Sequence, residues 1–162
     1  MTDVKQKIPV ASCLLATAVA VGAAMALLQL VFSVDIYRDT ANVYAYMERA
    51  LVRGEYAEAF HPGIPLLNVI LAWPFARLGL RPEQALALVS ELFYLATIPL
   101  LYLLLKEFLP KTPAAFGALL YACAPKIIRF SCTGLIDPGK IFFLVAGIFC
   151  ACRFVKGGFR SW

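Results

Sequence analysis

Long apolar runs alternate with short polar segments along this chain, and the lengths of the runs predict which of them cross a membrane. The first run, residues 8–34, contains no charged side chain and exceeds the roughly 20 residues that a helix needs to cross the hydrocarbon core. It is also too long for the apolar region of a cleaved signal peptide, which has about 7–15 residues. Further candidate runs follow at residues 85–105, 114–128 and 141–154. The pattern therefore predicts about four transmembrane helices.

The segment between the first two predicted spans is polar. Residues 35–63 carry a large share of the charged side chains, so we expect them to form a loop outside the membrane. Within this loop Asp39 or Thr40 can cap a helix that runs to Gly54, because apolar side chains recur there at helical spacing. We expect this helix, over about residues 39–54, to lie on the membrane surface.

A second surface helix is expected directly after this segment. The apolar run 64–76 is short, contains Pro74 and is closed by Arg77 and Arg81. A run of about 10–14 apolar residues lies at the membrane interface more often than it crosses the membrane. The run therefore predicts a surface helix over about residues 64–80.

Composition agrees with a protein whose surface is covered by lipid. The 162 residues are 62% apolar and 15% charged, with a mean hydropathy of +0.79, whereas soluble domains are about half apolar and about a quarter charged. The net charge of +5 does not indicate nucleic-acid binding, because the basic residues are dispersed or lie beside apolar runs. Membrane topology explains such a placement.

The basic residues also predict the orientation of the chain, because short cytoplasmic loops collect Lys and Arg. With four spans, the cytoplasmic side receives Lys5, Lys7, Lys106, Lys111, Arg153, Lys156 and Arg160. Both termini are then cytoplasmic, and residues 35–84 and 129–140 form two outer loops. We expect an all-α, polytopic transmembrane helical bundle, a single domain over residues 1–162, in the plasma (inner) membrane.

Glu91 is the one acidic residue inside a predicted span. An ionisable side chain within a membrane is costly and often functional. In the predicted topology Glu91 lies in the outer third of its helix, where it either faces an active cavity or snorkels to the surface.

Both outer loops carry an acidic residue beside a membrane boundary. Asp39 stands in the first loop, with Asp35 one helical turn earlier, and Asp137 stands in the second loop. Carboxylates that face one outer cavity would form a functional pair. The alternative is structural: Asp39 caps a helix, and Asp137, which Pro138 and Gly139 follow, makes a turn.

Three short motifs occur in order between the predicted spans. Residues 39–44, Asp-Thr-Ala-Asn-Val-Tyr, are similar to the first-loop motif of oligosaccharyltransferase catalytic subunits. Residues 61–67, His-Pro-Gly-Ile-Pro-Leu-Leu, resemble the His-Pro-Pro-Leu motif of protein mannosyltransferases and aminoarabinose transferases, with Gly63 in place of the second proline. Residues 125–138 resemble the second-loop motif, in which an Asp ends a Pro, Ser, Gly series. Over about residues 8–154 the chain thus resembles the GT-C glycosyltransferases, which use polyprenyl-phosphate-linked sugars.

The resemblance implies an inverting glycosyltransferase that works on the outer face of the membrane. The phosphate that leaves a polyprenyl-phosphate sugar is already anionic, so the acceptor hydroxyl needs a base and the leaving group needs no acid. Asp39 is the implied base, Asp35 is its close rival, and Asp137 is the acidic residue of the second loop. Tyr44 is the implied substrate contact of the first motif.

A phosphate at the outer surface also needs cations and hydrogen-bond donors. His61, Lys126, Arg129 and Lys140 are placed to supply them, although each cation also suits a snorkelling position at the interface. Some relatives bind a divalent metal through an acidic residue two positions after the second-loop Asp, and that position is Gly139 here. We therefore expect no metal and no other cofactor.

The resemblance also implies that the chain is the N-terminal portion of a GT-C module, because the family has further helices after the second-loop Asp. It implies a truncated, split or inactive gene product, or a partner chain that supplies the missing helices. The alternative function is a noncatalytic small membrane subunit that binds lipid or partner helices through its many small residues.

Overall fold

The computed structural model describes residues 9–32, 49, 53–55, 66–132 and 137–157. Every long regular element among these residues is a helix, and none of them forms a strand. The helices are α1 (Val10–Phe32), α3 (Leu66–Arg77), α4 (Pro82–Leu105), α5 (Lys111–Ala122), α6 (Pro125–Cys132) and α7 (Asp137–Gly157). The described part of the chain therefore confirms the predicted all-α class.

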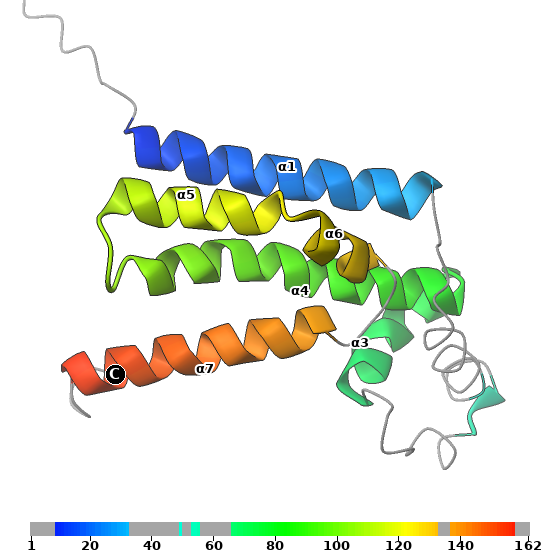
Figure 1. The fold of residues 1–162 in the computed structure, drawn as a ribbon. Helices are drawn as coiled ribbons and strands as arrows, with labels where there is room; N and C mark the ends of the chain where they lie inside the picture. The colour runs from blue at the N-terminus through cyan, green and yellow to red at the C-terminus, as the bar shows by residue number, and fades with distance from the viewer. Residues whose placement is uncertain (1–8, 33–48, 50–52, 56–65, 133–136, 158–162) are drawn as a thin grey trace, which may run out of the picture.

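The long helices run back and forth along a common direction (Figure 1). α1 runs toward the end where α3 and α6 lie, α4 returns, α5 and α6 run forward again, and α7 returns. At one end α1 begins, α4 meets α5 and α7 stops, and we call it the loop end. The opposite end holds α3, α6 and the starts of α4 and α7, and we call it the α6 end.

The outside of the bundle is apolar. Among the described helices, α4 and α7 are long and apolar enough to cross a membrane, and Val10–Met25 of α1 is a shorter apolar segment. Large apolar side chains lie exposed along the helices; Leu27, Phe116 and Leu144, for example, are 64%, 52% and 64% exposed. Such a surface suits hydrocarbon, in which apolar side chains need no burial.

α3 packs against the first half of α4. The buried cluster between them consists of Val69, Ala72, Ala85, Leu86 and Val89. With 12 residues, α3 is about 18 Å long, which is too short for a hydrocarbon core of about 30 Å. The bounds of α3 fall within the predicted range 64–80, and its place on the membrane surface stays a prediction.

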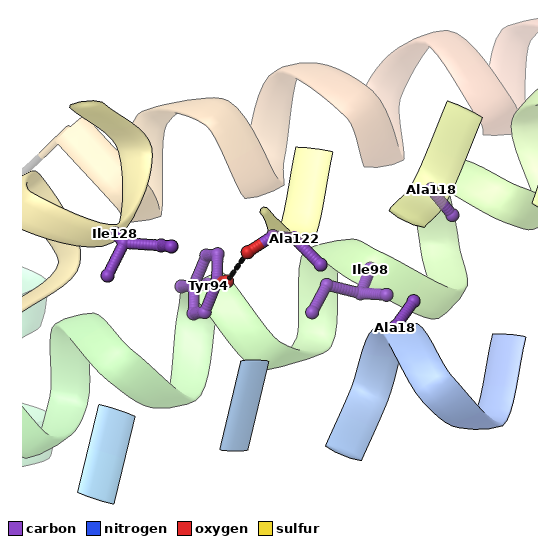
Figure 2. Close-up of a cluster of buried hydrophobic side chains, with 6 residues drawn as sticks. All are labelled: Ala18, Tyr94, Ile98, Ala118, Ala122 and Ile128. Carbon is purple, nitrogen blue, oxygen red and sulfur yellow. Dashed lines mark hydrogen bonds between the residues drawn. The ribbon is translucent and has the colours of Figure 1, made fainter. Parts of the chain in front are cut away.

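The span that the sequence predicts over residues 114–128 is divided into two helices, and neither, with 12 and 8 residues, is alone long enough to cross the hydrocarbon core. α5 ends at Ala122 and α6 begins at Pro125, because a proline has no N–H with which to continue the hydrogen bonds of α5. The Ala122 carbonyl, which the break deprives of its helical partner, accepts a 2.5 Å hydrogen bond from the hydroxyl of Tyr94 on α4 (Figure 2). Tyr94 is fully buried. The bond therefore satisfies a backbone group that water cannot reach.

The buried cluster around this bond joins α1, α4, α5 and α6. Its members are Ala18, Tyr94, Ile98, Ala118, Ala122 and Ile128 (Figure 2). Small residues let the helices approach closely: a Cβ on Gly22 of α1 would lie only 2.8 Å from Cδ1 of Ile98. Through Ile128 the cluster also holds α6 against the bundle, so the position of α6 depends on the same core.

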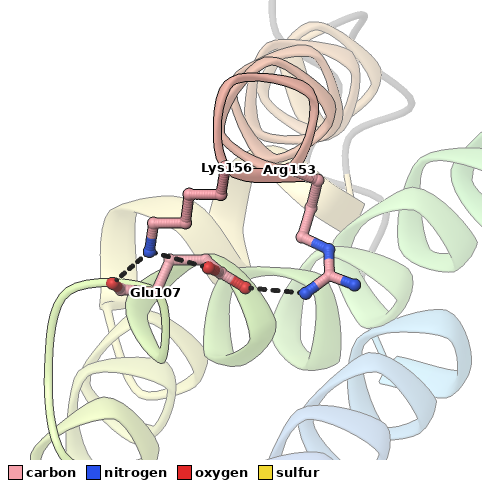
Figure 3. A network of polar contacts seen from close by, with 3 residues as sticks. All are labelled: Glu107, Arg153 and Lys156. Atoms are coloured by element: carbon pink, nitrogen blue, oxygen red, sulfur yellow. Dashed lines mark hydrogen bonds and ion pairs between the residues drawn. The ribbon is translucent and has the colours of Figure 1, made fainter. Parts of the chain in front are cut away.

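Ion pairs close the loop end (Figure 3). Nζ of Lys156 on α7 lies 2.9 Å from Oε2 of Glu107 and 2.7 Å from the backbone oxygen of the same residue. Nη1 of Arg153 lies 3.6 Å from Oε1 of Glu107. The hydrogen bond from Lys156 holds the pKa of Glu107 below its ordinary value. These contacts tie the last turn of α7 to the turn between α4 and α5.

Candidate functional site

α6 carries basic side chains on one face and buried ones on the other. Lys126 and Arg129 are exposed, whereas Ile128 and Ser131 are buried. The hydroxyl of Ser131 donates a 2.7 Å hydrogen bond to the carbonyl of Ile128, so it is satisfied within the helix. Nζ of Lys126 lies 5.8 Å from the centre of the Phe130 ring. The helix therefore presents two cations on the side that faces away from the core.

Asp137 is the first residue of α7. Its side chain is 46% exposed, and Oδ1 lies 3.5 Å from Nζ of Lys140, whose side chain is 63% exposed. An exposed pair of this kind contributes little to stability, so both groups stay available to a ligand. Pro138 and Gly139 are buried within the same turn. The three residues that could have made an isolated turn instead begin a long helix.

Four of the predicted site residues lie at the same end of the bundle. α6 and α7 contact each other, and both contact α4. Lys126, Arg129, Asp137 and Lys140 therefore all belong to the α6 end (Figure 1). The other predicted site residues lie outside the described residues, and their roles stay predictions: Asp35, Asp39, Tyr44 and His61.

Asn68 of α3 is a buried amide at the α6 end that the sequence analysis missed. Its side chain is 4% exposed, and its Oδ1 lies 3.6 Å from the position that a Cβ on Gly139 would occupy. Its Nδ2 has no hydrogen-bond acceptor among the residues that the structure describes. The sequence holds one weak signal: Asn68 is the one residue with an amide, hydroxyl or charged group in the apolar run 64–76.

Glu91 is buried within α4. Its side chain is 4% exposed, and the neighbouring Ser90 is fully buried. Glu91 therefore does not snorkel to the surface, and that it faces an active cavity stays a prediction. It belongs to the half of α4 that begins at the α6 end.

An apolar groove of about 330 Å³ lies between α3, α4 and α7. Its lining includes Leu71, Phe75, Leu92, Phe93, Ala96 and Phe142. The Phe93 ring connects this groove to the start of α7, because it lies 3.4 Å from the position of a Cβ on Gly139 and its centre is 5.5 Å from that of Phe142. The groove thus adjoins the first turn of α7.

Metal-binding residues do not gather in the described part of the chain. Among the described residues, no group of three His, Cys, Asp or Glu side chains could hold a metal ion. The cysteines whose side chains the structure describes are free thiols: Cys13, Cys123, Cys150 and Cys152. That the protein uses no metal stays an expectation.

Comparison with known proteins identifies the family of the chain. A family model described as dolichyl-phosphate-mannose-protein mannosyltransferase matches residues 61–162, which is more than half of the chain. The match includes the helices α3 to α7 and so the charged residues of the α6 end. No curated protein and no solved structure matches the chain. The family match confirms the resemblance to GT-C glycosyltransferases. The chain is an integral membrane protein that belongs to the dolichyl-phosphate-mannose-protein mannosyltransferase family.

Proposed function

We propose that the chain is a glycosyltransferase, or part of one, that transfers a sugar from a polyprenyl-phosphate donor to an acceptor hydroxyl on the outer face of the membrane. One observation carries the proposal: the family match covers α6 and the start of α7, which place Lys126, Arg129, Lys140 and Asp137 at the same end of the bundle. The family description names mannose as the sugar and protein as the acceptor. Mannose is therefore the first sugar to test.

The cations of the α6 end suit the phosphate of the donor. Transfer breaks the bond between the anomeric carbon and a phosphate oxygen, and the departing lipid phosphate needs positive charge and donors. Arg129 can bind two phosphate oxygens as a fork, whereas Lys126 and Lys140 act as point charges. Because the buried Ile128 anchors α6 in the core, its cations have a fixed place, which supports phosphate binding over simple snorkelling.

The apolar groove between α3, α4 and α7 suits the tail of the donor. Ligand sites are concave and lined mainly by apolar and aromatic side chains, as this groove is. Since the groove adjoins the first turn of α7, a lipid whose phosphate is bound beside Lys140 can place its first isoprenoid units there. Head group and tail would then be bound by neighbouring parts of one end of the bundle.

The acceptor hydroxyl needs a base, and we assign this role to Asp39, with Asp35 as its rival and Tyr44 as a substrate contact. The assignment rests on the motif of the first outer loop. A single working carboxylate is sufficient for inverting transfer, because the leaving phosphate needs no proton. Asp137 and His61 then serve the donor side, Asp137 by orienting the lysine with which it pairs at 3.5 Å. No step of this scheme needs a metal.

We place the α6 end on the outer side of the plasma (inner) membrane, with both termini in the cytoplasm. The start of α1 and the end of α7 lie at the same end of the bundle (Figure 1), and short basic segments favour the cytoplasmic side. A reporter enzyme fused after Trp162 should therefore be active in the cytoplasm. Activity of that reporter on the outer side would contradict the orientation.

Sugar transfer itself tests the proposed function. Membranes that contain the chain, alone or with a co-expressed partner, should transfer radiolabelled mannose from a polyprenyl phosphate to an acceptor, and membranes without the chain should not. Asp137→Asn should lower this transfer, whereas Glu107→Gln, the matching loss of a carboxylate at the loop end, should preserve it. Equal transfer with and without the chain, or equal losses in the two variants, would contradict the proposal.

A further inference from the structure

Asn68 differs from three other buried polar side chains of the bundle. Each of those donates a hydrogen bond to a backbone carbonyl: Tyr94 to Ala122, Thr97 to Phe93 and Ser131 to Ile128. Asn68 is 4% exposed, yet its Nδ2 has no acceptor in the described part of the chain. A buried donor without an acceptor destabilises a fold. A ligand that supplies the acceptor would explain such a group.

Two helices begin beside this amide. Asn68 belongs to the first turn of α3, and its side chain reaches the first turn of α7, where Oδ1 lies 3.6 Å from the position of a Cβ on Gly139. The first N–H groups of a helix have no partner within the helix and carry partial positive charge. The exposed ammonium of Lys140 lies on the same turn of α7. Donors and positive potential therefore converge here, as an oxyanion requires.

We propose that the starts of α3 and α7 form an oxyanion site, in which Nδ2 of Asn68 donates a hydrogen bond to a phosphoryl oxygen. The proposal rests on the proposed function, because the phosphoryl group is then that of the polyprenyl-phosphate donor; free inorganic phosphate has the same chemistry. Asn68 is a positioning residue, which orients the phosphate beside the cations of the α6 end. A half-turn about χ2 exchanges Oδ1 and Nδ2, so the donor can face α7.

A neutral amide suits this place better than a cation. A buried ammonium or guanidinium without a counter-ion is strongly destabilising when the ligand is absent. In this arrangement the exposed Lys140 supplies positive charge, and the buried Asn68 supplies a hydrogen bond that orients the phosphate. Gly139 leaves the space for it: a Cβ there would already contact the Phe93 ring at 3.4 Å, and a longer side chain would have to displace the ring or the amide.

Affinity and stability, measured together, test the site. The full chain in detergent is titrated with a labelled polyprenyl phosphate, and its thermal unfolding is followed in parallel. Asn68→Leu keeps the volume and removes the unsatisfied donor, so we expect an equal or higher unfolding temperature but an affinity about 10-fold to 100-fold lower. Asn68→Asp, which adds negative charge beside the phosphate, should bind more weakly still. Polyprenol, which lacks the phosphate, should bind equally to the wild type and to Asn68→Leu.

Thr97→Val is the matched control. Thr97 is buried, as Asn68 is, but its hydroxyl donates a 2.7 Å hydrogen bond to the Phe93 carbonyl, so this variant should lose stability and keep its affinity. An Asn68→Leu variant that binds polyprenyl phosphate as tightly as the wild type would overturn the oxyanion site. So would a variant that loses affinity for polyprenol as well, or one whose lower affinity comes with a lower unfolding temperature.

The probes also separate this inference from the proposed function. If the wild-type chain binds no polyprenyl phosphate, the proposed function fails. The oxyanion site is then supported if inorganic phosphate raises the unfolding temperature of the wild type and not that of Asn68→Leu. It is overturned if inorganic phosphate has no effect on the wild type either.

Discussion

The charged side chains at the two ends of the bundle differ in their partners and in their exposure. At the loop end, Lys156 bonds at 2.9 Å to Glu107, a residue 49 positions away, and Arg153 adds a second contact to the same carboxylate (Figure 3). At the α6 end, Asp137 and Lys140 pair at 3.5 Å within one helical turn, and both stay well exposed. The first set of contacts holds two distant segments together. The Asp137–Lys140 pair joins two side chains on one turn of the same helix, so it connects no distant segments.

This difference separates charges that stabilise the fold from charges that are available to a ligand. The side chain of Glu107 is only 16% exposed, and both of its carboxylate oxygens have a basic partner. The α6 end instead combines exposed cations, a buried amide without an acceptor among the described residues, and an adjoining apolar groove. Cations suit the phosphate of a lipid, and an apolar groove suits its tail.

The largest effect is expected from the carboxylate that we assign as the base. Asp39→Asn preserves shape and capping but cannot accept a proton, so the rate of sugar transfer should fall about 100-fold to 10,000-fold while folding and lipid binding stay normal. Asp35→Asn and Asp137→Asn are assayed in the same membranes, and Glu107→Gln at the loop end should keep its rate. Near-normal transfer in Asp39→Asn, with activity lost in Asp35→Asn, would assign the role of base to Asp35 instead. No effect in any of the three outer variants would contradict the mechanism.

A smaller effect, on stability, is expected where α5 meets α6. Tyr94→Phe leaves the buried Ala122 carbonyl without its donor, so the free energy of unfolding should fall by about 1–3 kcal/mol. Denaturant titration in detergent measures this loss. Tyr121→Phe is the matched control: its ring centre lies 5.8 Å from that of Tyr94, and its hydroxyl donates to no backbone carbonyl among the described residues. Equal losses in both variants would show that the bond to Ala122 contributes no stability.

The smallest effect is expected at the loop end. Glu107→Gln should lower the unfolding temperature slightly at neutral pH and leave the affinity for polyprenyl phosphate unchanged. Because its pKa is lowered in the folded state, Glu107 contributes stability above the ordinary carboxyl value of about 4.3. This contribution is lost as the pH falls through the lowered pKa. The unfolding temperatures of the wild type and of Glu107→Gln should therefore converge as the pH is lowered. A difference between them that widened in acid would contradict a stabilising role of the Glu107 carboxylate.

The helices could be predicted from the apolar runs, because length and hydropathy decide which segments suit a membrane. α4 and α7 overlap the predicted spans 85–105 and 141–154. The division between α5 and α6 could not be predicted from hydropathy, because the apolar run continues past Pro125. Pro125 ends the hydrogen bonding of α5, and Tyr94 stabilises the break, because it supplies a donor to the Ala122 carbonyl from another part of the chain.

The exposed part of the candidate site could be predicted, and the buried part could not. Lys126, Arg129 and Asp137 are charged residues beside apolar runs, and they belong to a motif that is visible in the sequence. Asn68 is a single amide in an apolar run, and one polar residue creates no periodic pattern from which its position could be predicted. Its burial depends on the packing of α3 beside the start of α7, a contact between distant segments that no local pattern encodes.

In the proposed function the α6 end, and not the loop end, binds the phosphate of the donor. Equilibrium binding of a labelled polyprenyl phosphate to the purified chain tests it most directly, with two variants that each lose two cations. Lys126→Ala combined with Arg129→Ala removes them from the α6 end, and Arg153→Ala combined with Lys156→Ala removes them from the loop end. We expect an affinity about 10-fold to 100-fold lower in the first variant and an unchanged affinity in the second. Unchanged binding in the first variant, or an equal loss in both, would contradict it.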